Sequence, residues 1–386
     1  MITDNARIEW VEAGETRSAL WRSESGWPAP NKVVPADDTM SADAAYRLAL
    51  DGTALLWRGD FQNARQLLQA LVRRIEHKGE RGRRKKATAP ATPTEAFHRH
   101  RLSQLQRART LAMLLIPFDA DHGIPLRRAP DARLACLEAH GPVDEPYVAS
   151  LRELLGVIGA HEWRRKGVMI PALDDRIHPW YGVFSPVRGE YVELVAQAPL
   201  PAGAHLAFDI GAGTGVLSAV LARRGMRVVA TDMDARALGC ARENLSRLGL
   251  AAQVEVVQAD LFPEGRAPLV VCNPPWLPGK PSSAIEYAIY DPGSRMLRGF
   301  LGGLAAHLEP GGEGWLIMSD FAEHLGLRSR EQLLGWIADA GLEVAARHDT
   351  KPVHPRASDP DDPLHAARSK EVTSLWRLRT AGRATG

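Results

Sequence analysis

The sequence predicts an α/β protein in which a doubly wound, Rossmann-like sheet of seven strands follows a mainly α-helical N-terminal domain. Two observations predict the sheet. Short apolar runs alternate with stretches of helical periodicity from about residue 203 onward, and this alternation is typical of a sheet with helices on both faces. The first run leads into "GAGTG" and then into a helical stretch. We expect the two domains to cover 1–177 and 178–386.

Composition indicates an ordinary globular protein. The chain has 386 residues, 45% hydrophobic and 24% charged, and a net charge of +2. So small a net charge selects no partner by its overall field. Cys136, Cys240 and Cys272 stand far apart, so we expect neither a disulfide framework nor a metal site. The apolar run 111–116 is too short to span a bilayer. The start of the chain lacks a signal-peptide pattern, and a cytoplasmic protein without a membrane partner is expected.

In the first half, apolar spacing predicts helices separated by a basic linker. Residues 1–42 are rich in Pro, Ser and Asp with weak periodicity, and we expect the ends of this stretch to be loosely ordered. Charges followed by Ala, Thr and Pro indicate an exposed linker over 78–94. Asp60 is the expected N-cap of a helix. Apolar residues three or four positions apart predict helices over 43–77 (in two pieces), 94–115 and 143–165.

In the second half, strands and helices alternate along the chain. The expected strands cover 205–209, 227–232, 253–258, 269–273, 313–320, 342–349 and 374–380. The expected helices cover 214–224, 235–248, 294–308 and 329–340. We expect the last two strands to pair as a terminal hairpin, with 351–370 as a mobile loop between them.

The segment "DIGAGTG" places three glycines between a strand and a helix. Glycine lets the backbone turn sharply and lets a ligand approach it closely. A dinucleotide fingerprint would require glycine where Val216 stands. A phosphate-binding P-loop is excluded, because no Gly-Lys-Ser or Gly-Lys-Thr follows. Taken alone, the loop is also compatible with a plain tight turn.

Acidic residues stand at the ends of three successive strands. Asp209 precedes the glycines, Asp232 closes the next strand, and Asp260 follows the third in "QADLF". An acid in the position of Asp232 can accept hydrogen bonds from both ribose hydroxyls of an adenosine. Asp260 could accept from an adenine amino group, with Leu261 and Phe262 as apolar cover. Each acid singly could be a solvated loop residue, but three at converging strand tips predict a site.

The motifs "DIGAGTG", "TDMD", "ARENLSRLGL", "QADLF" and "NPPW" occur in this order. Together they resemble class I S-adenosylmethionine-dependent methyltransferases over about residues 178–345. The closer resemblance is to the N-P-P-aromatic subgroup, which includes release-factor glutamine methyltransferases and rRNA small-domain N-methyltransferases. It implies that S-adenosyl-L-methionine is the cofactor. By position, it implies that Asp209, Gly211, Gly213 and Gly215 line the methionine end of the cofactor, that Asp232 holds the ribose and that Asp260 meets the adenine. The other cofactor contacts that it implies are Ala212, Met233, Leu261 and Asn273.

The segment "LVVCNPPWLP" ends a buried strand in Asn273, Pro274, Pro275 and Trp276. An amide or aromatic amine is a poor nucleophile, because its nitrogen lone pair is delocalised. The Asn273 side-chain oxygen and the Pro274 carbonyl can each accept a hydrogen bond from one of its two N–H groups. The restricted φ of proline holds the Pro274 carbonyl at a fixed angle. Trp276 can stack on the flat group. This tip suits N-methylation of a planar –NH2; the alternative is a strand-ending turn with a packed tryptophan.

Two weaker signals bear on the substrate. In 178–195, Pro186, Arg188 and Glu190 are similar to a Pro-Arg-x-x-Thr-Glu stretch of release-factor methyltransferases, but the threonine is missing. We interpret this stretch as a helix lead-in that covers the pocket. The segment 73–86 holds eight Lys or Arg against two Glu, which could contact RNA phosphates or form a solvated face.

The sequence therefore predicts an enzyme, a methyltransferase that modifies a planar nitrogen of a macromolecule. The expected partner is a protein glutamine, in a translation factor or ribosomal protein, or an RNA base. Residues 1–177 would recognise that substrate. A small-molecule methyltransferase and a non-catalytic methyltransferase-like binding module are the alternatives.

Overall fold

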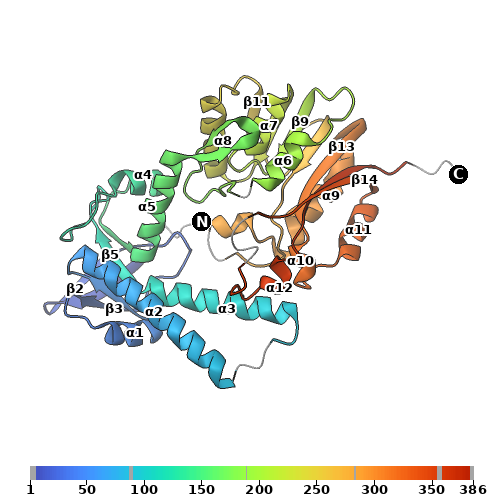
Figure 1. Cartoon of the computed structure of the whole chain (residues 1–386). Helices are drawn as coiled ribbons and strands as arrows, with labels where there is room; N and C mark the ends of the chain where they lie inside the picture. Colours follow the sequence, from blue (N-terminus) through green and yellow to red (C-terminus); the bar gives the residue numbers. More distant parts are fainter. Residues whose placement is uncertain (1–5, 87–89, 188, 282–283, 354–358, 383–386) are drawn as a thin grey trace. The chain divides into compact units, whose positions relative to one another are not determined.

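The computed structural model describes residues 6–86, 90–187, 189–281, 284–353 and 359–382 (Figure 1). The chain forms two compact units. Unit 1 comprises Met1–Ala91 and His98–Glu162, and unit 2 comprises Thr92–Phe97 and Trp163–Gly386. Each unit has its own sheet, and the two are described separately below.

Unit 2 is built on a seven-stranded sheet in the order β11-β10-β9-β12-β13-β15-β14. The neighbours from β11 to β13 are parallel, and β15 is antiparallel to both β13 and β14. The strands are β9 (Leu206–Ile210), β10 (Arg227–Asp232), β11 (Val254–Gln258), β12 (Ala267–Cys272), β13 (Leu308–Ser319), β14 (Leu342–Thr350) and β15 (Thr373–Thr380). The α/β class is confirmed, and so is the pairing of the last two strands.

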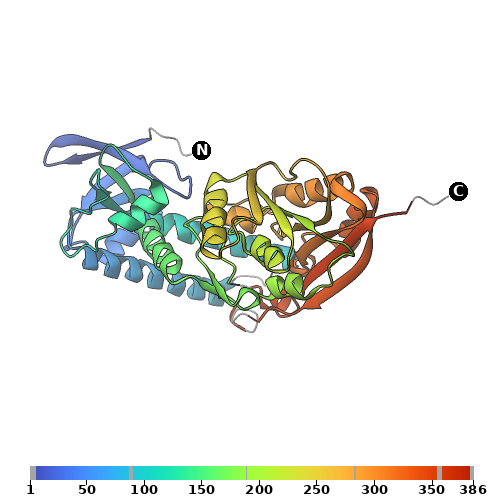
Figure 2. The same cartoon turned by 90° about the horizontal axis from the view of Figure 1, so that it is seen from above.

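Helices cover both faces of this sheet (Figures 1 and 2). One face carries α6 (Glu190–Gln197), α7 (Val216–Arg223) and α8 (Ala235–Arg247), and the other carries α9 (Arg295–His307) and α11 (Arg330–Asp339). Neighbouring strand residues pack on opposite faces: Ala207 joins the first core and Phe208 the second. A strand buried on both faces has an apolar run instead of an alternating pattern, and these runs could be recognised because they alternate with stretches of helical periodicity along the second half of the chain.

The strand order places a topological switch point between β9 and β12. From β9 the chain continues to β10 and β11 on one side, while β12 and β13 lie on the other side. In an open α/β sheet, ligands bind outside the carboxyl ends of the strands at such a point. The glycine loop follows β9 and "NPPW" follows β12, so both segments lie at this position.

Unit 1 contradicts the prediction of a mainly helical N-terminal domain. It holds a six-stranded sheet in the order β1-β2-β6-β5-β4-β3. The strands are β1 (Arg7–Glu12), β2 (Glu15–Arg22), β3 (Lys32–Ala36), β4 (Thr53–Trp57), β5 (Leu114–Phe118) and β6 (Tyr147–Ser150). The helices of the first half are α1 (Ala42–Leu50), α2 (Phe61–Lys86), α3 (Pro93–Ala112), α4 (Arg133–His140) and α5 (Leu151–Lys166), of which α3 and α5 have residues in both units.

The prediction fails here because fully buried strands resemble the apolar parts of helices. "TALLW" and "LLIPF" are buried at every position, so they lack the period of two that marks a half-buried strand. The sequence did contain a signal that ends a helix, Gly52, directly before the strand "TALLW". Gly52 has a φ of +80°, a left-handed conformation that ends α1 and that side chains disfavour. The predicted helix 143–165 failed in the same way, because its first part forms β6.

Other expectations for the first half had mixed outcomes. The Asp60 carboxylate accepts a hydrogen bond from the Gln62 amide at 2.9 Å, which confirms it as the N-cap of α2. Residues 6–42 contain three strands, and residues 1–5 lie outside the described residues. The linker expected over 78–94 is wrong up to Lys86, because α2 continues that far. The side chains of 78–89 lie outside the described residues.

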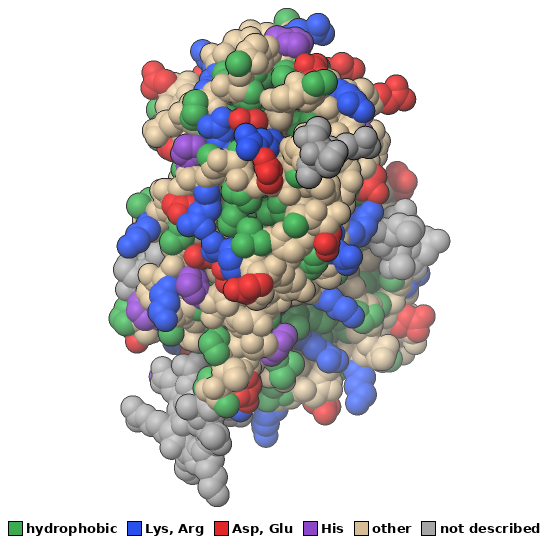
Figure 3. Space-filling view, turned by 90° about the vertical axis from the view of Figure 1, so that its right-hand side faces the viewer, with side chains coloured by type: hydrophobic (Ala, Val, Ile, Leu, Met, Phe, Trp, Pro, Cys, Tyr) green, Lys and Arg blue, Asp and Glu red, His purple; other side chains and the backbone are tan. Residues whose placement is uncertain are grey.

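On the face seen in Figure 3, Lys and Arg side chains are intermixed with Asp and Glu side chains. Among the described residues, each helix is too short or too polar to cross a membrane. The expected mobile loop 351–370 contains the short helix α12 (His365–Arg368), and its residues 354–358 lie outside the described part of the chain.

Candidate functional site

The glycine loop is held against the tip of β10 by its own backbone. The Gly211 and Ala212 amides both donate to the Thr231 carbonyl, at 2.9 and 2.8 Å. Gly211, Gly213 and Gly215 have φ values of +76°, +55° and +79°, so each occupies the left-handed region that glycine tolerates best. A Cβ on Gly211 would lie 2.6 Å from the methyl group of Met296, whereas a Cβ on Gly213 would meet nothing within 4 Å. The backbone at Gly213 therefore borders open space.

Asp232 links the tip of β10 to this loop. One carboxylate oxygen accepts from the Gly213 amide and the other from the Asp234 amide, each at 3.0 Å. Burial raises the pKa of this carboxyl group, and the two backbone hydrogen bonds oppose that rise. A carboxylate offers about four acceptor positions, so both oxygens can still accept hydrogen bonds from a ligand.

Asp209 is the most deeply buried acid of the predicted site. Its side chain is 1% exposed, and it accepts a hydrogen bond from the Ser218 hydroxyl at 2.6 Å. Burial raises the pKa of Asp209 from 3.8 to about 6, although the Ser218 hydrogen bonds act in the opposite direction. The charged form is disfavoured because little solvent reaches the group.

Asp260 and its neighbours lie at the tip of β11. Asp260 pairs with Arg295 at 2.8 Å, and both side chains are more than half exposed. Leu261 has a φ of +76°, and its carbonyl accepts a hydrogen bond from the Thr231 hydroxyl at 2.5 Å. The predicted apolar cover packs onto α9, where Phe262 stacks on His307 with ring centroids 4.2 Å apart.

The "NPPW" segment leaves β12 directly beside the glycine loop. In the parallel register Cys272 pairs with Ile210, so Asn273 follows at the level of Gly211 on the neighbouring strand. Asn273 is half-buried and Pro274 is buried. The indole Nε1 of Trp276 donates to Oδ1 of Asn273 at 2.9 Å. This hydrogen bond was not foreseen from the sequence, which suggested only a stacking role for the ring.

The sheet thus brings most of the predicted site residues to one edge. The register aligns Asp232 with Gln258 and Thr231 with Ile210, so the tips of four neighbouring strands carry the predicted set. Met233 is 54% exposed beside Asp232. The segment 178–195 leads into α6 as expected; Arg188 lies outside the described residues.

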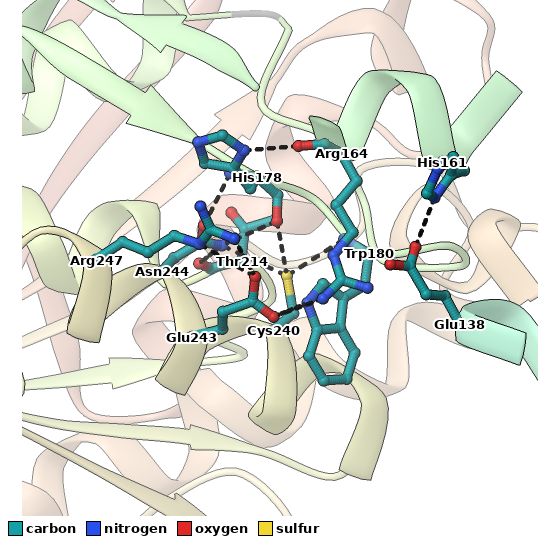
Figure 4. A network of polar contacts seen from close by, with 10 residues as sticks. All are labelled: Glu138, His161, Arg164, His178, Trp180, Thr214, Cys240, Glu243, Asn244 and Arg247. Atoms are coloured by element: carbon teal, nitrogen blue, oxygen red, sulfur yellow. Dashed lines mark hydrogen bonds and ion pairs between the residues drawn. The ribbon is translucent and has the colours of Figure 1, made fainter. Parts of the chain in front are cut away.

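Sequence reasoning missed Asn244, a buried amide on α8 (Figure 4). It is 1% exposed. Its Nδ2 group donates to the Thr214 carbonyl of the glycine loop at 3.1 Å and to the His178 carbonyl at 3.3 Å. Its Oδ1 accepts from the His178 amide at 2.8 Å. A signal was present, because Asn244 falls on the apolar face of α8 with Cys240 and Ala241, where a polar residue needs a partner.

The chain is similar to known methyltransferases in this region. Residues 181–330 match the family model "Methyltransferase small domain". The chain is 30% identical over 166 residues to a release factor glutamine methyltransferase of Cereibacter sphaeroides, covering 39% of this chain and 57% of the relative. It is 31% identical over 159 residues to a ribosomal RNA small subunit methyltransferase C of Alcanivorax borkumensis, covering 39% and 45%.

A third relative matches over a shorter segment. This is a ribosomal protein L11 methyltransferase of Pelotomaculum thermopropionicum, 49% identical over 69 residues, or 17% of this chain and 22% of the relative. The chain thus spans between 22% and 57% of the length of these three relatives. The methyltransferase resemblance read from the motifs is confirmed for the region that the family model covers.

Proposed function

We propose that this chain, whose residues 181–330 match a methyltransferase small domain, is an S-adenosylmethionine-dependent N-methyltransferase that acts on a planar nitrogen of a macromolecule. One observation carries the proposal. The register that pairs Cys272 with Ile210 sets Asn273 next to the glycine loop at the switch point of the sheet. A side chain that could accept a hydrogen bond from an –NH2 group would then lie beside the backbone that would hold the cofactor.

The residues at this edge fit S-adenosylmethionine. The backbone at Gly213 borders open space, and both oxygens of Asp232 keep acceptor positions for ribose hydroxyls. Bound S-adenosylmethionine supplies an electrophilic methyl group on a positively charged sulfur. The proposed cofactor contacts are Asp209, Gly211, Ala212, Gly213, Gly215, Asp232, Met233, Asp260, Leu261 and Asn273.

Asn273 and Pro274 would prepare the acceptor nitrogen. Oδ1 of Asn273 and the Pro274 carbonyl oxygen would each accept a hydrogen bond from one of its two N–H groups. These hydrogen bonds would draw the nitrogen toward a tetrahedral shape and free its lone pair. Pro275 stiffens the chain after these acceptors. No strong base is needed before transfer, because the proton leaves a cationic product. Holding the nitrogen in line with the methyl group then lowers the barrier by orientation.

The substrate is proposed to be a protein glutamine or an RNA base. The relatives' names cover a release factor, a ribosomal protein and ribosomal RNA. We propose residues 178–386 as the catalytic domain and 1–177 as the part that recognises the substrate. The basic segment 73–86 lies in the second half of α2; Arg74 in it pairs with Asp43 at 2.8 Å. Binding to RNA that weakens steeply with salt would favour the RNA substrate.

Calorimetric titration of S-adenosylmethionine and S-adenosylhomocysteine tests the cofactor site. We expect the wild type to bind both ligands and Asp232→Ala to bind neither, because the ribose acceptors are lost. Glu255→Ala removes an exposed carboxylate from β11 of the same sheet and should bind like the wild type. Absence of binding by the wild type would reject the methyltransferase proposal and leave the binding-module alternative.

Transfer of a tritiated methyl group then tests the reaction. The acceptor fractions are the RNA, the proteins and the small molecules of a lysate, separated by RNase and protease treatment. We expect label in RNA or protein, and Asn273→Ala should lower the rate by about 10²–10³-fold, by analogy with the loss of one preorganised transition-state hydrogen bond. Label confined to the small molecules would replace the macromolecular proposal by its small-molecule alternative.

A further inference from the structure

Trp276 is fixed both through its ring and through its backbone. The ring packs against the apolar cores on both faces of the unit 2 sheet. Its carbonyl oxygen accepts a hydrogen bond from Nη2 of Arg328 at 3.3 Å, and Arg328 is itself only 4% exposed. The next residue, Leu277, bonds by its amide to Ile289 at 3.1 Å and by its carbonyl to Asp291 at 2.8 Å. These contacts therefore fix both the position and the orientation of the Trp276 indole ring.

The indole N–H decides which end of the Asn273 side chain faces it. Nε1 of Trp276 lies 2.9 Å from Oδ1 of Asn273, and an indole N–H can only donate. It therefore bonds the oxygen of the carboxamide and repels the –NH2 end. A phenylalanine has no donor, so the carboxamide could turn over and present its own N–H groups to the substrate nitrogen. Two donors would then face each other, and no hydrogen bond would form.

We propose that Trp276 is a positioning residue, whose indole N–H holds the Asn273 carboxamide with Oδ1 ready to accept the substrate N–H. A carboxamide oxygen has two lone pairs. One is bonded to Trp276, so the other takes a single N–H of the acceptor group, and the second N–H is left to the Pro274 carbonyl. The catalytic meaning of this inference rests on the proposed function, whereas the hydrogen bond can be measured without a substrate.

Nuclear magnetic resonance of the indole N–H groups tests the hydrogen bond itself. The chain has 10 tryptophans, and the Trp276 signal is identified by its loss in Trp276→Phe. We expect Asn273→Ala to shift this signal and to speed its exchange with water, because the acceptor is gone. Asn273→Asp keeps an oxygen acceptor and should keep the signal protected. Equal shift and exchange in the wild type and Asn273→Ala would overturn the proposal.

Kinetics test the consequence for catalysis. Trp276→Phe keeps an aromatic ring, and we expect kcat to fall about threefold to tenfold, the value of one neutral hydrogen bond. The affinity for S-adenosylmethionine, measured by calorimetry, should stay within about twofold, because Asn273 is the one proposed cofactor contact that the substitution touches. A loss of cofactor affinity as large as the loss of kcat would indicate a general loosening of the site and would overturn the positioning role. Trp336→Phe on α11 is the matched control and should change neither quantity.

A double-mutant cycle separates positioning from stacking. If Trp276 acts only through Asn273, then Trp276→Phe in the Asn273→Ala background should cost nothing further. A loss of the same size in both backgrounds would show that the ring acts on its own, and the positioning role would be wrong. Failure of the wild type to methylate any RNA or protein fraction would instead reject the proposed function, while the resonance measurement would still decide the hydrogen bond.

Discussion

At the scale of single residues, the candidate site is shaped by hydrogen bonds formed before any ligand arrives. The Gly213 amide bonds to Asp232, the Ser218 hydroxyl to Asp209 and the Trp276 indole to Asn273. Each hydrogen bond fixes the direction of an acceptor that a ligand would use. Binding therefore loses little side-chain entropy at these residues. The residue types could be chosen from the sequence. Their partners could not, because Ser218 lies nine residues beyond Asp209 inside α7 and the sequence suggested only a stacking role for Trp276.

The buried Asp209 carboxyl should make the free energy of unfolding depend on pH. Its folded-state pKa is raised to about 6 from 3.8, so its contribution to stability is complete below the unfolded pKa and is lost as pH rises through about 6. At pH 8 the charged group costs roughly 3 kcal/mol. The loss runs from the unfolded pKa to about 6, so we expect Asp209→Asn to stabilise the free protein at pH 8, and by roughly half as much at pH 5, in thermal or urea unfolding.

Ser218→Ala provides the complementary measurement for Asp209. The Ser218 hydroxyl bond lowers the pKa of the carboxyl group, so its removal should raise that pKa further and move the loss of stability to higher pH. A gain from Asp209→Asn that is equal at pH 5 and pH 8 would contradict a buried, titrating carboxyl group at this position.

At the scale of elements, α8 supports the glycine loop through one side chain. Asn244 bonds to the Thr214 carbonyl and to both backbone groups of His178. Asn244→Ala would leave these buried groups without partners, so we expect a loss of about 2–4 kcal/mol in the free energy of unfolding and weaker binding of S-adenosylmethionine. Urea unfolding and calorimetry measure the two effects.

Arg247→Ala is the matched control on the same helix. Arg247 pairs with Glu243 at 3.0 Å and is 53% exposed, and a solvent-screened pair of this kind contributes less than about 1 kcal/mol. Equal losses in Asn244→Ala and Arg247→Ala would mean that α8 tolerates the loss of the Asn244 bonds. The inference that Asn244 stabilises the glycine loop would then be wrong.

At the scale of the whole molecule, the chain contributes a short segment to unit 2 before unit 1 is complete. Residues Thr92–Phe97 belong to unit 2 although they lie far from its other residues in sequence. Phe97 is 4% exposed and lies in a cluster with Leu277, Phe321 and Leu325. Leu277 directly follows Trp276 in the chain. Phe97→Ala should cost about 3–5 kcal/mol by opening a cavity, measured by urea unfolding of the full chain.

Leu102→Ala on the same helix is the control for Phe97. Leu102 is 57% exposed, and its truncation should change the free energy of unfolding by no more than about 0.5 kcal/mol. Because Leu277 adjoins the "NPPW" segment, Phe97→Ala should also lower the rate of methyl transfer. A Phe97→Ala variant as stable as Leu102→Ala would show that 92–97 does not stabilise unit 2.

The sequence by itself determined the alternation of strands and helices in the second half, the glycine loop and the acids at the strand tips. These features are local: apolar runs, glycines and tip residues are readable because each depends on neighbours in the chain. Only the tertiary structure decided the sheet of unit 1, the level of Asn273 beside Gly211, the bond from Trp276 and the support from Asn244. Fully buried strands lose their period of two, and partners across strands or helices are set by register and packing, which no short stretch of sequence contains.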